Sequence, residues 1–169
     1  VRAGGWGHLL GDEGSAYWIA FQALSRALRS SEGRDLPTGL LEAAKAHFGL
    51  REGSDLVPLV YEGLDKTRIA GFARLVAAAR DSGDPLALDV YARAAQELVG
   101  LVAAVDARIG GRLGRRRLSL RGGLVEGDPR FGAELAALVK KRLPEVELVA
   151  PIADAAVGAC VLARGLLGS

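Results

Sequence analysis

The sequence contains no methionine and a single cysteine, Cys160, among its 169 residues. One cysteine excludes an internal disulfide and fits a protein of the reducing cytoplasm. No stretch approaches the roughly 20 uninterrupted apolar residues of a membrane-spanning helix. The 22 basic and 20 acidic residues nearly balance, which argues against a nucleic-acid or membrane-surface partner. These absences leave the class of helix-rich globular domains.

Aromatic residues are also scarce, at 5 % of the chain, whereas half of all residues are hydrophobic. Most of these are Ala, Leu and Val, and the length suffices for one domain with a sizeable core. The chain starts at Val1 inside a glycine-rich stretch, with no leading element and no initiating methionine. We therefore expect it to be the C-terminal portion of a longer protein.

Polar chemistry is concentrated in residues 4–18, where glycines, two adjacent carboxylates and an indole precede an apolar helix. Glycines adopt positive φ at low cost and let ligands approach the backbone. A carboxylate such as Asp12 accepts hydrogens from sugar hydroxyls, and an indole such as that of Trp6 covers the apolar face of a sugar ring. Taken alone, Asp12 and Glu13 are explained more simply as partners of the helix dipole. The alternative for Trp6 is a core aromatic, although a Trp between two glycines is poorly placed to anchor a helix or strand.

The middle of the chain has mostly helical periodicity. Ser15 is expected to cap a first helix that is apolar on most faces, and such a helix is buried between other elements. Further helices are predicted over 37–48, over 54–62, around 69–79, and from an Asp84-Pro85 start to Gly110.

The pattern changes near the C-terminus. A short strand over 118–120 leads into Gly122 and Gly123, followed by a helix over 130–143, a strand over 146–149 and a helix over 152–167. This order is a βαβα unit, which implies parallel strands joined by a right-handed crossover. Ligands bind such sheets at the C-terminal ends of the strands, where the two glycines fall.

The stretch GGWGHLLGDEGSAYWIA at residues 4–20 closely resembles the signature of the N-acetylglucosamine kinases within the BadF-type (BadF/BadG/BcrA/BcrD) ATPase family. Residues 61–85 and the strand–glycine–helix stretch around Gly122 resemble the same family at similar spacing. The resemblance implies an α/β fold, here the helix-rich C-terminal lobe of an actin-like, hexokinase-like (ribonuclease H-like) ATPase.

Within residues 1–169, the resemblance implies a substrate-binding turn and helix start at 1–18, a helical region at 19–110 and a nucleotide-side βαβα unit at 111–169. The resemblance favours a sugar-binding role for Asp12 over a role as partner of the helix dipole. The implied sugar contacts are Gly5, Trp6, Gly7 and Asp12. The implied adenosine contacts are Gly122, Gly123, Gly127 and Ala70, although a small residue at a helix crossing explains Ala70 equally well.

The activity that the resemblance implies is ATP-dependent phosphorylation of N-acetylglucosamine or glucosamine at the 6-hydroxyl, with ATP and Mg²⁺ as cofactors. The family carries its phosphate-binding turn and catalytic Asp in or next to the N-terminal lobe, which this sequence does not contain. We therefore expect neither catalytic nor metal-binding residues here. The expected partners are the sugar, the other lobe of the same protein and a second copy of the protein in a homodimer.

Two alternatives stay open. The same family contains ATPase activators of dehydratases, which hold an iron–sulfur cluster through paired cysteines, and a single cysteine argues against that role. The chain also fits a non-catalytic sugar-sensing module that kept the fold.

Overall fold

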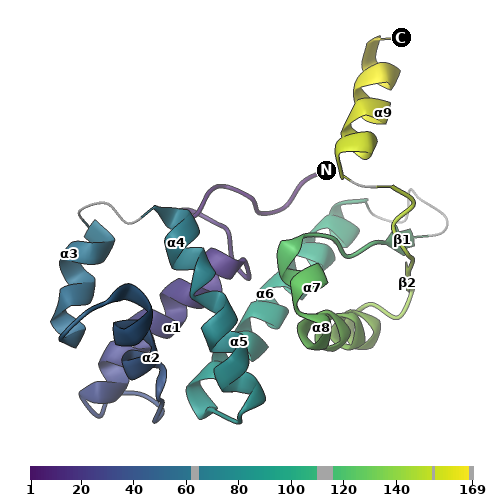
Figure 1. Cartoon of the computed structure of the whole chain (residues 1–169). Helices are drawn as coiled ribbons and strands as arrows, with labels where there is room; N and C mark the ends of the chain where they lie inside the picture. Colours follow the sequence, from purple (N-terminus) through teal and green to yellow (C-terminus); the bar gives the residue numbers. More distant parts are fainter. Residues whose placement is uncertain (62–64, 110–115, 154, 168–169) are drawn as a thin grey trace.

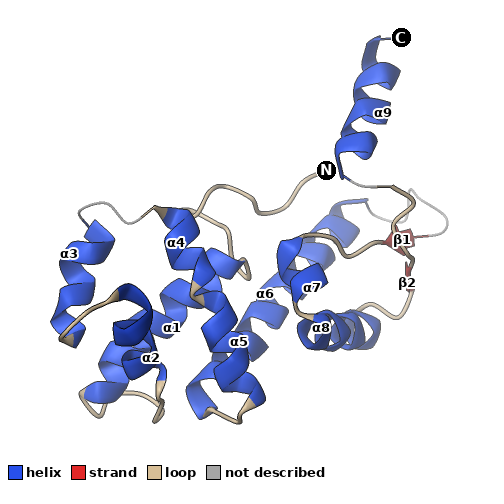
Figure 2. Cartoon of the chain, viewed as in Figure 1, coloured by secondary structure: helices blue, strands red, loops and turns tan. Residues whose placement is uncertain are grey.

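The computed structural model describes residues 1–61, 65–109, 116–153 and 155–167. Its first part is helical, as Figure 2 shows, and a short two-stranded sheet follows. The helical part comprises α1 (Ala16–Ser31), α2 (Leu40–Phe48), a 3₁₀ turn (Gly53–Asp55), α3 (Leu56–Tyr61), α4 (Lys66–Gly71), α5 (Ala73–Asp81) and α6 (Pro85–Ile109). The C-terminal part comprises β1 (Arg116–Leu118), α7 (Gly123–Gly127), α8 (Pro129–Arg142), β2 (Val146–Leu148) and α9 (Ala155–Leu167).

Helix α1 lies at the centre of the helical part and packs against α2, α4, α5 and α6 (Figure 1). It starts as predicted, because the Ser15 hydroxyl accepts a hydrogen bond of 3.1 Å from the Trp18 amide. Its buried face consists of Ile19, Ala20, Ala23, Leu24 and Ala27. The prediction that α1 is buried on most faces is wrong for Phe21, which is 40 % exposed.

The helix predicted around residues 69–79 is divided in two. Helices α4 and α5 meet at Phe72, which ends one helix and begins the other and is fully buried. The start of α6 is confirmed, since the Asp84 carboxylate accepts a hydrogen bond from the Ala87 amide. The same carboxylate accepts hydrogen bonds from the Thr38 hydroxyl and the Gly39 amide. These bonds hold the segment before Leu40, so α2 begins three residues later than predicted.

The parallel sheet of the predicted βαβα unit is confirmed. Arg116 pairs with Val146 and Leu118 with Leu148. Strand β1 begins two residues earlier than predicted, where the Arg116 guanidinium donates to both carboxylate oxygens of Asp106 on α6 at 2.8 and 2.9 Å. The helix ends predicted at Glu62 and Gly110 lie outside the described residues.

The sheet side is joined to the helical part through α8. Its buried residues Phe131, Leu135 and Val139 belong to the same core as α1 and α6. The last helix, α9, starts at Ala155 rather than residue 152 and extends away from the other elements (Figure 1). Within the described ranges no helix is both long and apolar enough to cross a membrane.

Candidate functional site

The glycine-rich segment before α1 forms a closed turn. The Trp6 amide donates to the Gly11 carbonyl at 2.8 Å, and the Gly11 amide donates to the Gly7 carbonyl at 2.9 Å. Gly5 and Gly7 have φ values of +67° and +91°, which residues with a Cβ rarely adopt. The four predicted sugar contacts, Gly5, Trp6, Gly7 and Asp12, therefore lie on one compact turn.

Close packing holds this turn against α6. A Cβ at Gly14 would lie 2.5 Å from Leu98 Cγ and 2.9 Å from the Ala94 carbonyl oxygen, and the residue also has a φ of +78°. A Cβ at Gly4 would lie 2.9 Å from a methyl carbon of Leu101. Because α6 is the longest helix described, it gives the turn a rigid support.

The indole of Trp6 is 67 % exposed, so Trp6 is not a core aromatic. The guanidinium of Arg2 lies 4.6 Å from the centre of the Trp6 ring, in a cation–π arrangement. Arg2 is held in turn, because Arg108 on α6 donates to its carbonyl oxygen at 2.8 Å. The turn thus presents a large aromatic surface to solvent in a supported position.

Asp12 is half-buried and lies three residues before the Ser15 cap. Its carbonyl oxygen accepts a hydrogen bond from the Ser15 amide. No hydrogen bond or ion pair joins its carboxylate to any residue that the structure describes. The first turn of α1 contains no acidic residue, so the structure does not support the helix-dipole explanation for Asp12.

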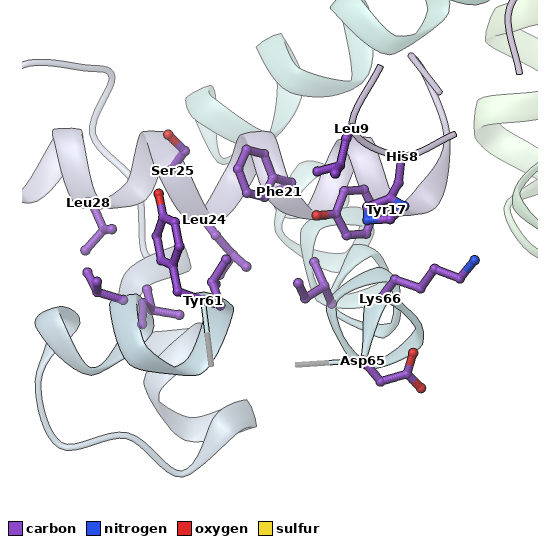
Figure 3. A pocket seen from close by; sticks show the side chains of 14 residues that line it. His8, Leu9, Tyr17, Phe21, Leu24, Ser25, Leu28, Tyr61, Asp65 and Lys66 are labelled. Carbon is purple, nitrogen blue, oxygen red and sulfur yellow. The ribbon is translucent and has the colours of Figure 1, made fainter. Parts of the chain in front are cut away.

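A groove of about 1040 Å³ lies beside the turn (Figure 3). His8 and Leu9 of the turn line one end, Tyr17 and Phe21 of α1 line the side, and residues of α3 and α4 lie opposite. The rings of His8 and Tyr17 meet edge to face at 5.0 Å.

Sequence analysis missed this groove. Its signal was the row of residues 17, 21, 24 and 28, which lie on one face of α1. An apolar row of this kind predicts burial in the core, whereas the structure leaves Phe21 on a partly open surface that Tyr61 of α3 also lines.

The predicted adenosine contacts divide between two places. Gly122, Gly123 and Gly127 lie at or within α7, shortly after the end of β1, and all three are exposed. Gly122 has a φ of +119°, and a Cβ added to any of the three would meet no atom within 4 Å. Ala70 lies on α4, which packs against α1 and α5, whereas α7 packs against α8. The structure therefore groups the three glycines and leaves Ala70 on a separate element.

The described residues form no candidate site for a resident metal ion. Within the described ranges, no group of three or more His, Cys, Asp or Glu side chains is placed to hold one. We therefore assign no step of the chemistry below to a metal held by these residues.

Comparison with known proteins identifies the family of the chain. The model of the BadF/BadG/BcrA/BcrD ATPase family matches residues 1–163. The chain belongs to this family. The match covers the turn, the helical part and the βαβα unit together.

Two curated relatives are sugar kinases. The chain is 32 % identical, over 165 residues, to the N-acetylmuramic acid/N-acetylglucosamine kinase of Clostridium acetobutylicum, covering 97 % of this chain and 54 % of that protein. It is 26 % identical to the N-acetyl-D-glucosamine kinase of Dictyostelium discoideum, covering 96 % of this chain and 52 % of that protein. The chain thus spans about half the length of the curated relatives it matches.

The fold also has a counterpart among solved structures. The crystal structure of a candidate N-acetylglucosamine kinase from Chromobacterium violaceum superposes with a TM-score of 0.69 at 25 % sequence identity. The similarity covers 95 % of this chain and 50 % of that one. The helix-rich α/β architecture with a small parallel sheet is therefore shared with a structure of this class.

Proposed function

We propose that the protein phosphorylates an amino sugar with ATP, and that this chain is the C-terminal lobe that supplies the sugar and adenosine contacts. N-acetylglucosamine or glucosamine is the substrate, and the 6-hydroxyl is the acceptor. The observation that carries the proposal is the half-buried carboxylate of Asp12, which pairs with no described residue, on a turn that also exposes Trp6. The kinase relatives and the family support it.

At the sugar end, the half-buried Asp12 carboxylate has no partner among the described residues, so its oxygens are free to accept hydrogen bonds from a ligand. A sugar presents several hydroxyl donors within a small volume. In our proposal two of them donate to Asp12, and the exposed Trp6 ring covers an apolar face of the sugar. Gly5 and Gly7 let the sugar approach the main chain, because a side chain at either position would occupy the space above the turn.

At the nucleotide end, Gly122 and Gly123 face open space. In our proposal the adenosine lies flat against this backbone, with Gly127 at the far end of the same short helix. A side chain at these positions would occupy the volume that the nucleotide needs. Ala70 contributes from α4 if the nucleotide reaches across to that helix.

The remaining half of the protein, as judged from the relatives' lengths, supplies the groups that act on the phosphates. Phosphoryl transfer requires stabilisation of the β- and γ-phosphates, a base near the attacking hydroxyl and exclusion of water. We assign these tasks to the other lobe and place the reaction in the cytoplasm. This chain's own part is to bind and orient both substrates.

The proposal is tested by an ADP-release assay with ATP, Mg²⁺ and a panel of hexosamines. Full-length protein is expected to release ADP only when an amino sugar is present, and the 169-residue chain alone is expected to release none. Sugar-dependent turnover by the isolated chain would contradict the division of labour between the lobes. Absence of sugar-dependent turnover by the full-length protein would contradict the proposed activity.

A further inference from the structure

Arg80, near the end of α5, is the most deeply buried charged residue of the described chain, with 2 % of its surface exposed. Its Nη2 donates to Asp128 Oδ1 at 3.0 Å, and its Nη1 lies 3.0 Å from Asp128 Oδ2. Nε and Nη2 also donate to Asp81 Oδ1 at 3.0 and 2.9 Å. The guanidinium carbon lies 4.2 Å from the centre of the Tyr91 ring on α6. One side chain thus joins α5 and α6 to the start of α8.

Asp128 is the residue that connects α7 to α8. Its amide donates to the Leu124 carbonyl at 3.0 Å, which ends α7. Its Oδ1 accepts from the Phe131 amide at 3.0 Å, which begins α8. Burial on its own would raise the pKa of Asp128, but hydrogen bonds from Arg80 and the Phe131 amide outweigh it and lower the pKa. The carboxylate is therefore ionised when it holds this junction.

Helix α7 has little freedom once Asp128 is fixed. A Cβ at Gly132 of α8 would lie 3.2 Å from Val125 Cγ1 and 3.3 Å from the Val125 carbonyl oxygen. Phe131, next to Gly132, is fully buried and meets the Tyr91 ring edge to face at 5.2 Å. The orientation of α7, and with it of Gly122 and Gly123, is thus set by its junction with α8.

We propose that Arg80 is a positioning residue of the nucleotide site, which by holding Asp128 fixes α7 and its glycine pair in the orientation that ATP requires. The inference rests on the proposed function. Burying a guanidinium costs desolvation free energy that an apolar side chain of similar volume does not incur, so a buried ion pair is a poor device for stability alone. It is a good device for fixing one geometry, because the planar fork of Arg binds a carboxylate in a single orientation.

Two substitutions in the full-length protein distinguish a positioning role of Arg80 from a purely structural one. Arg80→Met keeps most of the side-chain volume and removes the fork. Asp128→Asn keeps an oxygen that accepts from the Phe131 amide but removes the ion pair. If either change leaves α7 correctly oriented about one-tenth of the time, the apparent Kd and the KM for ATP rise about tenfold. The KM for the amino sugar and the kcat at saturating ATP should change by less than about twofold.

Arg26→Met is the matched control. Arg26 is also a buried arginine, and it donates to Asp35 and to Asp89 of α6. None of these residues lies on α7 or α8. Arg26→Met should lower the melting temperature while leaving the affinity for ATP unchanged, since its partners do not touch the glycine pair.

The readouts are calorimetric titration with ATP, steady-state kinetics for both substrates and thermal unfolding. Arg80→Met and Asp128→Asn should weaken the binding of ATP but not that of the amino sugar. If both variants keep the wild-type Kd for ATP, or if the two KM values rise together, the positioning role is contradicted. If Arg80→Met does not fold, Asp128→Asn decides by the same criteria. A different outcome would separate the two claims. If Arg80→Met weakens ATP binding but the wild-type protein shows no sugar-dependent turnover, the proposed function is contradicted and the positioning role of Arg80 is kept.

Discussion

Two glycine-rich segments, residues 4–14 and residues 122–127, lie on either side of the helical part in the sequence. In the first, the main chain at Gly14 lies so close to α6 that an added Cβ would be 2.5 Å from Leu98 Cγ. In the second, an added Cβ at Gly122, Gly123 or Gly127 would meet no atom within 4 Å. Gly14 is therefore required by the fold itself, whereas packing within this chain does not require Gly123 or Gly127.

The difference shows why glycine in a motif is an ambiguous signal. A glycine that the fold requires will affect stability whether or not a ligand binds near it. A glycine that faces empty space and does not have a positive φ affects mainly what comes to fill that space. Substitutions in the two segments should consequently change different quantities. Those at Gly14 should change the free energy of unfolding, and those at Gly123 should change the affinity for ATP.

The largest effect is expected for Gly14→Ala. The new Cβ would overlap Leu98 and the Ala94 carbonyl oxygen and would also hold a φ of +78°. Overpacking and a left-handed backbone together should lower the free energy of unfolding by about 2–4 kcal/mol. Gly5→Ala is the control, because Gly5 has a φ of +67° but open space, and it should cost only about 1–2 kcal/mol. Urea unfolding of both variants checks this, and equal losses would contradict the close-packing argument.

The second effect concerns Gly123→Val in the full-length protein. A branched side chain on this exposed face should weaken ATP binding by about tenfold or more, a loss of roughly 1.4 kcal/mol. Stability should stay within about 0.5 kcal/mol, because the site is a surface position with no close neighbour. Titration with ATP and with sugar, beside thermal unfolding, tests the contrast with Gly14→Ala. Unchanged ATP affinity would remove Gly123 from the nucleotide site.

Sequence patterns predicted the local features that depend on neighbouring residues. The Ser15 cap, the Asp84 start of α6, the end of α2 at residue 48 and the parallel pairing of β1 with β2 are all confirmed. It was also predictable that the four expected sugar contacts lie together, since they are close in sequence: Gly5, Trp6, Gly7 and Asp12.

Features that depend on long-range packing were not predictable. The break between α4 and α5 at Phe72 interrupts no helical periodicity, and it follows from the burial of that ring in the core. The groove beside Tyr17 and Phe21 is lined by the turn, α1, α3 and α4, which lie far apart in the sequence. The Arg80–Asp128 contact joins residues 48 positions apart, and nothing in either local pattern signals the other.

The smallest effect concerns pH and the ion pair between Arg26 and Asp35. Hydrogen bonds from Arg26 hold the pKa of Asp35 well below its usual range. The unfolded chain, with a pKa near 3.9, then binds more protons below about pH 5, so this stabilising contribution is lost as the pH falls. The difference in unfolding free energy between wild type and Asp35→Asn should therefore shrink from about pH 7 to about pH 3. Urea unfolding at several pH values checks it, and a constant difference would contradict the ion-pair assignment.

The most direct test of the account is sugar binding by Asp12→Asn in the full-length protein. The change keeps the shape of the side chain and replaces one acceptor oxygen by a donor. Because hydrogen bonds to a charged group contribute roughly 1.5–3 kcal/mol, the affinity for N-acetylglucosamine should fall about tenfold to a hundredfold. The affinity for ATP and the melting temperature should change little. A variant that binds the sugar normally but has lost about 0.3–1 kcal/mol of stability would instead identify Asp12 as a partner of the helix dipole and contradict the sugar-binding role.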